Sequence, residues 1–248
     1  MSYYSPQHQP DHNNMYGQEN FVDKEVVSAE SAKAFVTQVF GWMFLAMILS
    51  GGIAYAFATS DLIYMLFDGT TGKATPFFWI ALLSPIGIVL LMNLGLEKLS
   101  FAVILALFIV YASLMGISLS VIFLRYDELA IAKAFGITAG AFGVMAVAGY
   151  TTKADLSKFG MIMIFGLVGI VIASLFNMFG SENSQFSLLI DIACIIVFTG
   201  LIAWKMQMVR QMGEQVGTTQ PKLAVFMALS LYITFINLFL TILRFMRR

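Results

Sequence analysis

Residues 223–245 read LAVFMALSLYITFINLFLTILRF, and this stretch decides the class of the fold. It carries a single charged side chain, that of Arg244, close to its end. An α-helix needs about 20 consecutive apolar residues to cross a hydrocarbon layer roughly 30 Å thick. The stretch therefore predicts a transmembrane helix, and the composition of the whole chain supports the same interpretation.

The chain has 248 residues, of which 59% are hydrophobic and 11% are charged. Soluble domains usually contain about 25% charged residues. Because so few charged side chains cannot cover a globule, the lipid bilayer is the expected surrounding. The 14 basic and 14 acidic residues cancel, and no run of Lys or Arg is long enough to follow a nucleic-acid backbone. Nucleic acid is therefore excluded as a partner.

Six further apolar runs precede the first one, separated by breaks that contain polar and turn-forming residues. Such breaks are expected where the backbone returns to water. The six runs are residues 34–58, 77–94, 100–124, 131–148, 160–179 and 186–204. Together with residues 223–245 they predict an all-α, polytopic membrane protein whose seven transmembrane helices occupy residues 32–248.

Residues 1–31 are polar and lack the basic start, apolar stretch and cleavage site of a signal peptide, which predicts a disordered tail. With seven spans, eight Lys and Arg residues lie on the side of this tail and six on the other. The excess favours a cytoplasmic tail. The C-terminus then lies outside, although three of the six opposing residues are the terminal arginines Arg244, Arg247 and Arg248.

Two features of the runs bear on helix packing. Pro85 follows Ser84 inside the second run and should loosen or kink that helix, which membrane helices tolerate when a neighbour or a Ser hydroxyl covers the freed carbonyl. Small residues are also spaced as in helices that approach each other closely in lipid. They are Gly136, Gly140 and Gly143 in the fourth run, and Gly166 and Gly169 in the fifth.

The chain offers little catalytic chemistry. Its two histidines, His8 and His12, lie in the polar tail, so no intramembrane Ser/His pair or His-ligated metal site can form. Its one cysteine, Cys194, lies inside an apolar run and has no Cys partner. We therefore expect neither an enzyme nor a cofactor or metal site.

The sixth run has a charged residue near each end. Asp191 lies five residues into the run, where an intramembrane acid is either a functional group or a hydrated group at the interface. Lys205 follows Trp204 at the other end, a position from which a lysine usually extends to the interface. The two charges are about 21 Å apart along one helix, so they cannot pair with each other.

The seventh run has the most polar positions. Ser230, Thr234 and Asn237 occur at positions i, i+4 and i+7, which places them on one helix face. Such a face should contact protein or water. Hydrogen bonds between helices and a polar path through the bundle both remain open, and Asp191 is a further candidate for such a path.

Several stretches resemble the bacterial branch of the Bax inhibitor-1 family, also called the lifeguard or TMBIM family. The nearest similarity is at residues 228–240 (ALSLYITFINLFL). The others are residues 149–157 (GYTTKADLS), 116–126 (GISLSVIFLRY), 169–177 (GIVIASLFN) and 38–42 (QVFGW). The resemblance covers nearly everything after the tail and implies a compact bundle whose last helix is central.

The resemblance also implies a function. Some family members are described as pH-sensitive calcium leaks, in which a carboxylate near the end of the sixth span shares a proton with another in the seventh. Residues 200–205 (GLIAWK) and 231–237 (LYITFIN) place Lys205 and Thr234 at these two positions. Because both acids are replaced, we expect the pH gating to be altered or lost and calcium passage to be impaired.

Two functions remain open. The first is an ion leak, for calcium or another cation, with changed selectivity. The second is a non-transporting interaction protein of the bacterial inner membrane that modulates a membrane protease or a stress response. An enzyme lacks a supporting set of residues.

Overall fold

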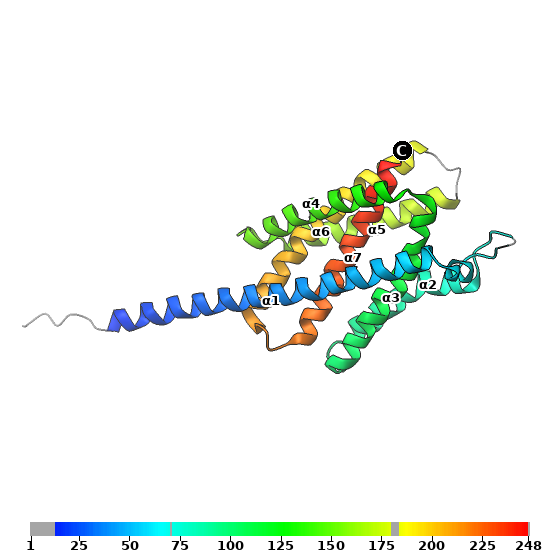
Figure 1. The fold of residues 1–248 in the computed structure, drawn as a ribbon. Helices are drawn as coiled ribbons and strands as arrows, with labels where there is room; N and C mark the ends of the chain where they lie inside the picture. Colours follow the sequence, from blue (N-terminus) through cyan, green and yellow to red (C-terminus); the bar gives the residue numbers. More distant parts are fainter. Residues whose placement is uncertain (1–12, 70, 180–183, 248) are drawn as a thin grey trace, which may run out of the picture.

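A computed structural model describes residues 13–69, 71–179 and 184–247 (Figure 1). This part of the chain forms seven long helices and one short 3-10 helix. The elements are α1 (Asn13–Ala58), η1 (Asp61–Met65), α2 (Pro76–Gly95), α3 (Phe101–Arg125), α4 (Glu128–Thr151), α5 (Ser157–Phe179), α6 (Ser184–Val216) and α7 (Pro221–Met246).

Within the described residues, each of these seven helices is long and apolar enough to cross a membrane. The predicted all-α, polytopic fold is therefore confirmed. Two helices are longer than expected. The helix of α1 starts at Asn13, whereas a disordered tail was expected over residues 1–31, of which 1–12 lie outside the described residues. The helix of α6 continues beyond Trp204 to Val216, about three further turns.

The helix ends follow the local sequence. The Thr75 hydroxyl accepts a hydrogen bond from the Phe78 N–H at the start of α2, and the Ser100 hydroxyl accepts one from Val103 at the start of α3. Ser and Thr satisfy amide donors that have no partner inside the first turn. Pro221 begins α7, where its missing N–H costs nothing.

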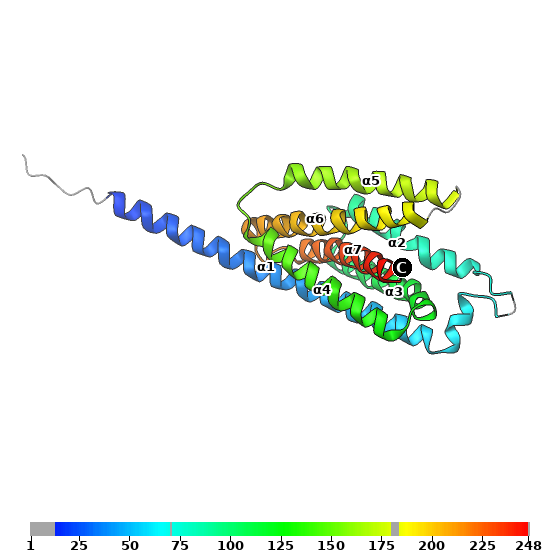
Figure 2. The same ribbon diagram turned by 90° about the horizontal axis from the view of Figure 1, so that it is seen from above.

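The centre of the bundle is α7, which is the most buried of the helices that the structure describes. It packs against α1, α3, α4 and α6, while α5 packs on the outer side of α6 (Figure 2). Aromatic side chains fill its contacts: Tyr232 meets Tyr111 of α3, and Phe235 meets Phe135 and Phe142 of α4. The central position of the last helix, expected from the family resemblance, is confirmed.

Pro85 lies inside α2 and is buried, and α2 continues through it. Because proline has no N–H, the carbonyl four residues earlier, that of Ala81, loses its donor within the helix. The Ser118 hydroxyl of α3 supplies the replacement, at 3.0 Å. A neighbouring helix therefore covers the freed carbonyl, as the sequence suggested, and the residue that does so is Ser118.

The glycines at close helix contacts differ from those that spacing indicated. At Gly136, Gly140, Gly143 and Gly169 a Cβ atom would have no heavy atom within 4 Å, so these glycines do not mediate close contact, and at Gly166 the nearest atom is 3.4 Å away. Close approach occurs instead at Gly116 against Ser50, Gly149 against Ala203, Gly160 against Trp204, and Gly213 against Ala32. Spacing along one helix does not reveal which face meets a neighbour.

Candidate functional site

The Lys205 side chain lies between α6 and α7. Its Nζ atom is 2.7 Å from Thr234 Oγ1 and 3.0 Å from the Ser230 carbonyl oxygen, and it donates a hydrogen bond to each. The Thr234 hydroxyl donates in turn to the Ser230 carbonyl, at 2.9 Å. An ammonium group is thus held by two oxygen atoms of the central helix.

This placement corrects the expectation that Lys205 extends to the membrane interface beside Trp204. Because α6 continues to Val216, Lys205 lies well inside the helix. Its side chain turns inward, where the Thr234 hydroxyl and the Ser230 carbonyl replace water. Lys205 and Thr234, the two positions at which the resemblance led us to expect an acid pair, are therefore in direct contact.

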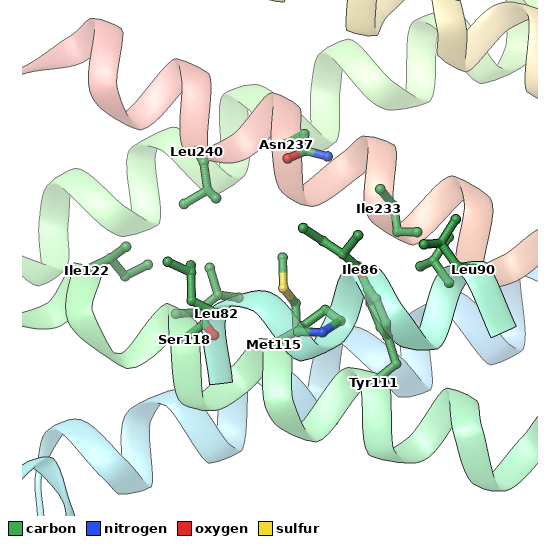
Figure 3. A pocket seen from close by; sticks show the side chains of 13 residues that line it. Leu82, Ile86, Leu90, Tyr111, Met115, Ser118, Ile122, Ile233, Asn237 and Leu240 are labelled. Carbon is green, nitrogen blue, oxygen red and sulfur yellow. The ribbon is translucent and has the colours of Figure 1, made fainter. Parts of the chain in front are cut away.

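Asn237, the third member of the polar face on α7, does not join the Lys205 group. It lines a cavity of about 410 Å³ between α2, α3 and α7. Figure 3 shows Asn237 on the α7 side of this cavity, with Met115 and Ser118 of α3 across from it. Pro85 contributes to the α2 wall.

A second cavity, of about 370 Å³, lies between α3, α5, α6 and α7. It also reaches Asn237, and it shares Ile122 and Leu240 with the first cavity. Arg244 and Tyr126 lie in its wall near the end of α7. Asn237 is therefore the polar side chain of α7 that both cavities contact.

Asp191 is buried and forms an ion pair with Arg244, whose Nη2 lies 2.9 Å from Asp191 Oδ1. The side chain of Asp191 is 3% exposed and that of Arg244 is 55% exposed. One of the two interpretations of the sequence was a hydrated Asp191 at the interface, whereas the structure buries this side chain against Arg244. Asp191 is also separate from the Lys205 group, at the opposite end of α6, as the 21 Å estimate required.

Arg244 was not recognised as a partner from the sequence. The predicted order of the spans could have indicated this partner. Because α6 begins and α7 ends on the same side of the bundle, Asp191 and Arg244 lie near the same membrane face. Pairing requires in addition that the two side chains point toward each other, which depends on the rotation of each helix about its axis.

The turn between α4 and α5, which carries the family-like stretch 149–157, is held by the extended part of α6. The buried Gln207 amide donates to the Ala154 carbonyl at 2.7 Å and accepts from the Leu156 N–H at 2.8 Å. Arg210 donates to the carbonyls of Tyr150, at 2.5 Å, and Thr152, at 3.3 Å. These side chains satisfy backbone groups at the end of α4 and in the turn that follows it.

Asp155 lies in the same turn, two residues before Ser157, the first residue of α5. Hydrogen bonds from the side chain and backbone of Ser157 hold the pKa of this carboxyl below its usual range. A lowered pKa means that the ionised form stabilises the folded turn above the ordinary carboxyl range, and that this contribution is lost as the pH falls. The Asp155 carboxylate is exposed, so this pH-dependent stabilisation is confined to the turn.

Metal-ligating side chains are not clustered in the part of the chain that the structure describes. No group of three or more His, Cys, Asp or Glu side chains in this part is close enough to hold a metal ion. His8 and His12 lie outside the described residues. The polar side chains of α6 and α7 inside the bundle include instead the Lys205–Thr234 contact, the Asp191–Arg244 pair and Asn237.

Seven apolar helices, of which the last is buried among the others, define a polytopic helical membrane protein in which polar partners hold the charged side chains of Lys205 and Asp191. The family model described as "Inhibitor of apoptosis-promoting Bax1" matches residues 32–248. The chain belongs to the Bax inhibitor-1 family.

Its relatives include two bacterial proteins of similar length. The chain is 37% identical over 228 residues to the inner membrane protein YbhL of Escherichia coli K12, which covers 90% of this chain and 94% of YbhL. It is 39% identical over 215 residues to an uncharacterized protein of Borreliella burgdorferi, which covers 86% of this chain and 90% of that protein. The similarity therefore extends over the whole bundle.

Proposed function

We propose that this protein is a bacterial inner-membrane protein that does not leak calcium by the acid-pair mechanism expected from its family, and that it acts through contacts with other membrane proteins. The observation that carries the first part is the Lys205 ammonium between α6 and α7, bonded to Thr234 and Ser230. The proposed location is supported by the relative YbhL, an inner membrane protein.

The physical argument is electrostatic. The ammonium already uses two oxygen atoms that would otherwise be ligands for a cation. Two unit charges 4 Å apart repel by about 4 kcal/mol at an effective dielectric constant of 20, so a divalent cation beside Lys205 would be disfavoured by roughly 8 kcal/mol. No carboxylate at these two positions offsets that repulsion, since they hold Lys205 and Thr234.

Calcium flux into liposomes that contain the purified protein tests the proposal. We expect flux equal to that of empty vesicles in both mildly acidic and mildly basic buffer. The double variant Lys205→Asp with Thr234→Asp should create a pH-dependent flux, because it places two carboxylates where the ammonium lies. Lys205→Met with wild-type Thr234 is the control that removes the positive charge alone. Calcium flux through the wild-type protein would overturn the proposal.

A role in protein contacts is supported by the long α1, which begins at Asn13, before its membrane span starts at Ala29. A membrane protease is the kind of partner that the family suggests. Deleting residues 1–28 removes this extension and keeps Ala32, which packs closely on Gly213 of α6. Partners captured from membranes should be lost on this deletion, and unchanged partners would contradict a role for the extension.

A second candidate is a leak with altered selectivity, favoured by the two cavities that meet at Asn237. Flux of protons and of monovalent ions in the same liposomes separates it from the first. If such flux occurs, Asn237→Leu should abolish it, because this change removes the polar side chain common to both cavities. A flux that persists in Asn237→Leu would exclude a path through this position.

A further inference from the structure

The end of the bundle where α7 finishes has a second kind of site. We propose that it binds one anionic phospholipid, with the phosphate among Arg125, Lys133 and Arg247 and one acyl chain in the groove between α3 and α5. The proposal does not rest on the absence of a calcium leak, and it competes with an ion path through the 370 Å³ cavity, because the acyl chain would occupy that cavity.

The headgroup part is a cavity of about 230 Å³ formed by the end of α3, the start of α4 and the end of α7. Three cationic side chains, those of Arg125, Lys133 and Arg247, line it, together with one acidic side chain, that of Asp127. The cavity therefore carries a net positive charge. An anionic phosphate is complementary to it, and a zwitterionic headgroup is less so.

The position of one of these cations is set by an aromatic contact. The Arg247 guanidinium lies 5.5 Å from the centre of the Tyr126 ring, a cation–π arrangement. Arg244 is not counted among the free cations of the cavity, because it is paired with Asp191. The three cations that line the cavity come from α3, α4 and the end of α7, which meet at this membrane face.

The acyl-chain part is the groove between α3 and α5, which is the 370 Å³ cavity described above. Its walls are mainly apolar and include Leu167, Ile170 and Val171 of α5. Val171 is 51% exposed, so the groove opens toward the lipid. A groove of this kind suits a hydrocarbon chain.

The two cavities adjoin. Tyr126 and Leu243 line both of them, so the basic cavity and the apolar groove meet at the ends of α3 and α7. Lys133 lies five residues beyond Glu128, the first residue of α4, and is therefore about 7.5 Å along that helix, toward the membrane. A ligand with an anionic head and an apolar chain fits both parts at once, whereas inorganic phosphate would use the first alone.

Native mass spectrometry of the purified full-length protein in detergent tests the site. The probes are dioleoyl phosphatidylglycerol, dioleoyl phosphatidylcholine, a dihexanoyl phosphatidylglycerol and inorganic phosphate. We expect one tightly bound phosphatidylglycerol per chain, with weaker binding of phosphatidylcholine and of the short-chain lipid. Each basic side chain near an anionic surface contributes about fivefold to affinity, so Lys133→Gln with Arg247→Gln should reduce binding roughly 25-fold.

The matched control is Lys153→Gln with Lys158→Gln, which removes the same charge from exposed positions in the turn between α4 and α5. Binding should be unchanged in this control. Thermal unfolding of both double variants without lipid verifies that each is folded. Equal loss in the two variants, equal binding of phosphatidylcholine, or equal binding of inorganic phosphate would overturn the proposal. Loss of a co-purifying protein instead of lipid would identify an acidic protein segment as the occupant.

Discussion

Lys205 shows how a charged side chain is kept inside a membrane bundle. Its ammonium donates to the Thr234 hydroxyl and to the Ser230 carbonyl, both on the most buried helix. Burying a charge without such partners is costly, and removing one partner of a buried charge usually costs more than replacing the whole group by an apolar one. The contact therefore predicts an asymmetry between variants.

Thr234→Val should lower the free energy of unfolding by about 1–3 kcal/mol, because the ammonium loses its closest acceptor. In the Lys205→Met background the same change should cost less than about 1 kcal/mol. The control is Thr241→Val, at a buried threonine of α7 whose hydroxyl donates within its own helix, to Asn237. Thermal unfolding in detergent of the wild-type protein, the three single variants and the double variant is the measurement. Equal costs at Thr234 and Thr241 would contradict the contact.

The Asp191–Arg244 pair predicts a second asymmetry. Arg244→Gln removes the ionic partner of a carboxylate whose side chain is 3% exposed, and should cost about 3 kcal/mol. Asp191→Asn leaves a half-exposed guanidinium that water can solvate, and should cost less than about 1 kcal/mol. Thermal unfolding of the two single variants and of the double variant is the measurement. A larger cost for Asp191→Asn would show that the pair is not what stabilises this end of the bundle.

At the scale of the helix, the bond from Ser118 to the Ala81 carbonyl repairs the gap that Pro85 creates. Ser118→Ala should cost about 1 kcal/mol, because the carbonyl loses its donor. With Pro85→Ala in the background, the helix supplies its own N–H, and Ser118→Ala should have almost no effect. Ser113→Ala is the matched control, since the Ser113 hydroxyl donates within α3 to Ile109. Thermal unfolding of these variants is the measurement. If Ser118→Ala lowered stability equally with Pro85 and with Pro85→Ala, the Ser118 hydroxyl would not be replacing the missing donor.

Two glycines of α4 should respond in opposite ways to alanine. A Cβ atom at Gly149 would lie 2.1 Å from the Ala203 carbonyl oxygen, and all its nearest neighbours are backbone atoms of α6. Gly149→Ala should therefore cost at least about 1–3 kcal/mol. At Gly140 the space is open, and alanine should stabilise the helix by about 0.5–1 kcal/mol. The yield of folded protein and its thermal unfolding provide the measurement, and equal effects would contradict the tight crossing.

For the whole molecule, seven spans place the two ends of the chain on opposite sides of the membrane. The distribution of Lys and Arg predicts a cytoplasmic N-terminus. Alkaline phosphatase, which is active only outside the cytoplasm, should therefore be active when fused after residue 248 and inactive when fused in the connection between α6 and α7, residues 217–220. A fluorescent protein that folds only in the cytoplasm should show the reverse. Activity at both positions would contradict the odd number of spans.

Arrangement in the bundle explains why the polar groups of α7 have different roles although they share one helix face. Ser230 and Thr234 meet Lys205 of α6, while Asn237 lines cavities at α2, α3 and α5. A single helix face thus contacts several neighbours along its length. This is why one polar path through Ser230, Thr234 and Asn237 could not be inferred from their common face alone.

Hydropathy along the chain was sufficient for the seven spans, their order and their approximate ends, because crossing the hydrocarbon layer is a local requirement on each segment. The family motifs added the central position of α7, and they led us to expect an acid pair at the positions of Lys205 and Thr234. The length of α6 was not predicted, because the segment after Trp204 is polar and its helix is held by contacts of Gln207 and Arg210 with the turn between α4 and α5.

Three contacts between helices were determined by the tertiary structure and not by hydropathy. They are the pairings of Lys205 with Thr234, of Asp191 with Arg244 and of Ser118 with the Ala81 carbonyl. Each pair joins two helices, and its existence depends on how far each helix is rotated about its own axis and on which neighbours it has. Hydropathy places a charge at a depth in the membrane, but it does not state what that charge faces. Because burial of a charge or a carbonyl is stable only with a partner, the packing of the seven helices assigns these partners.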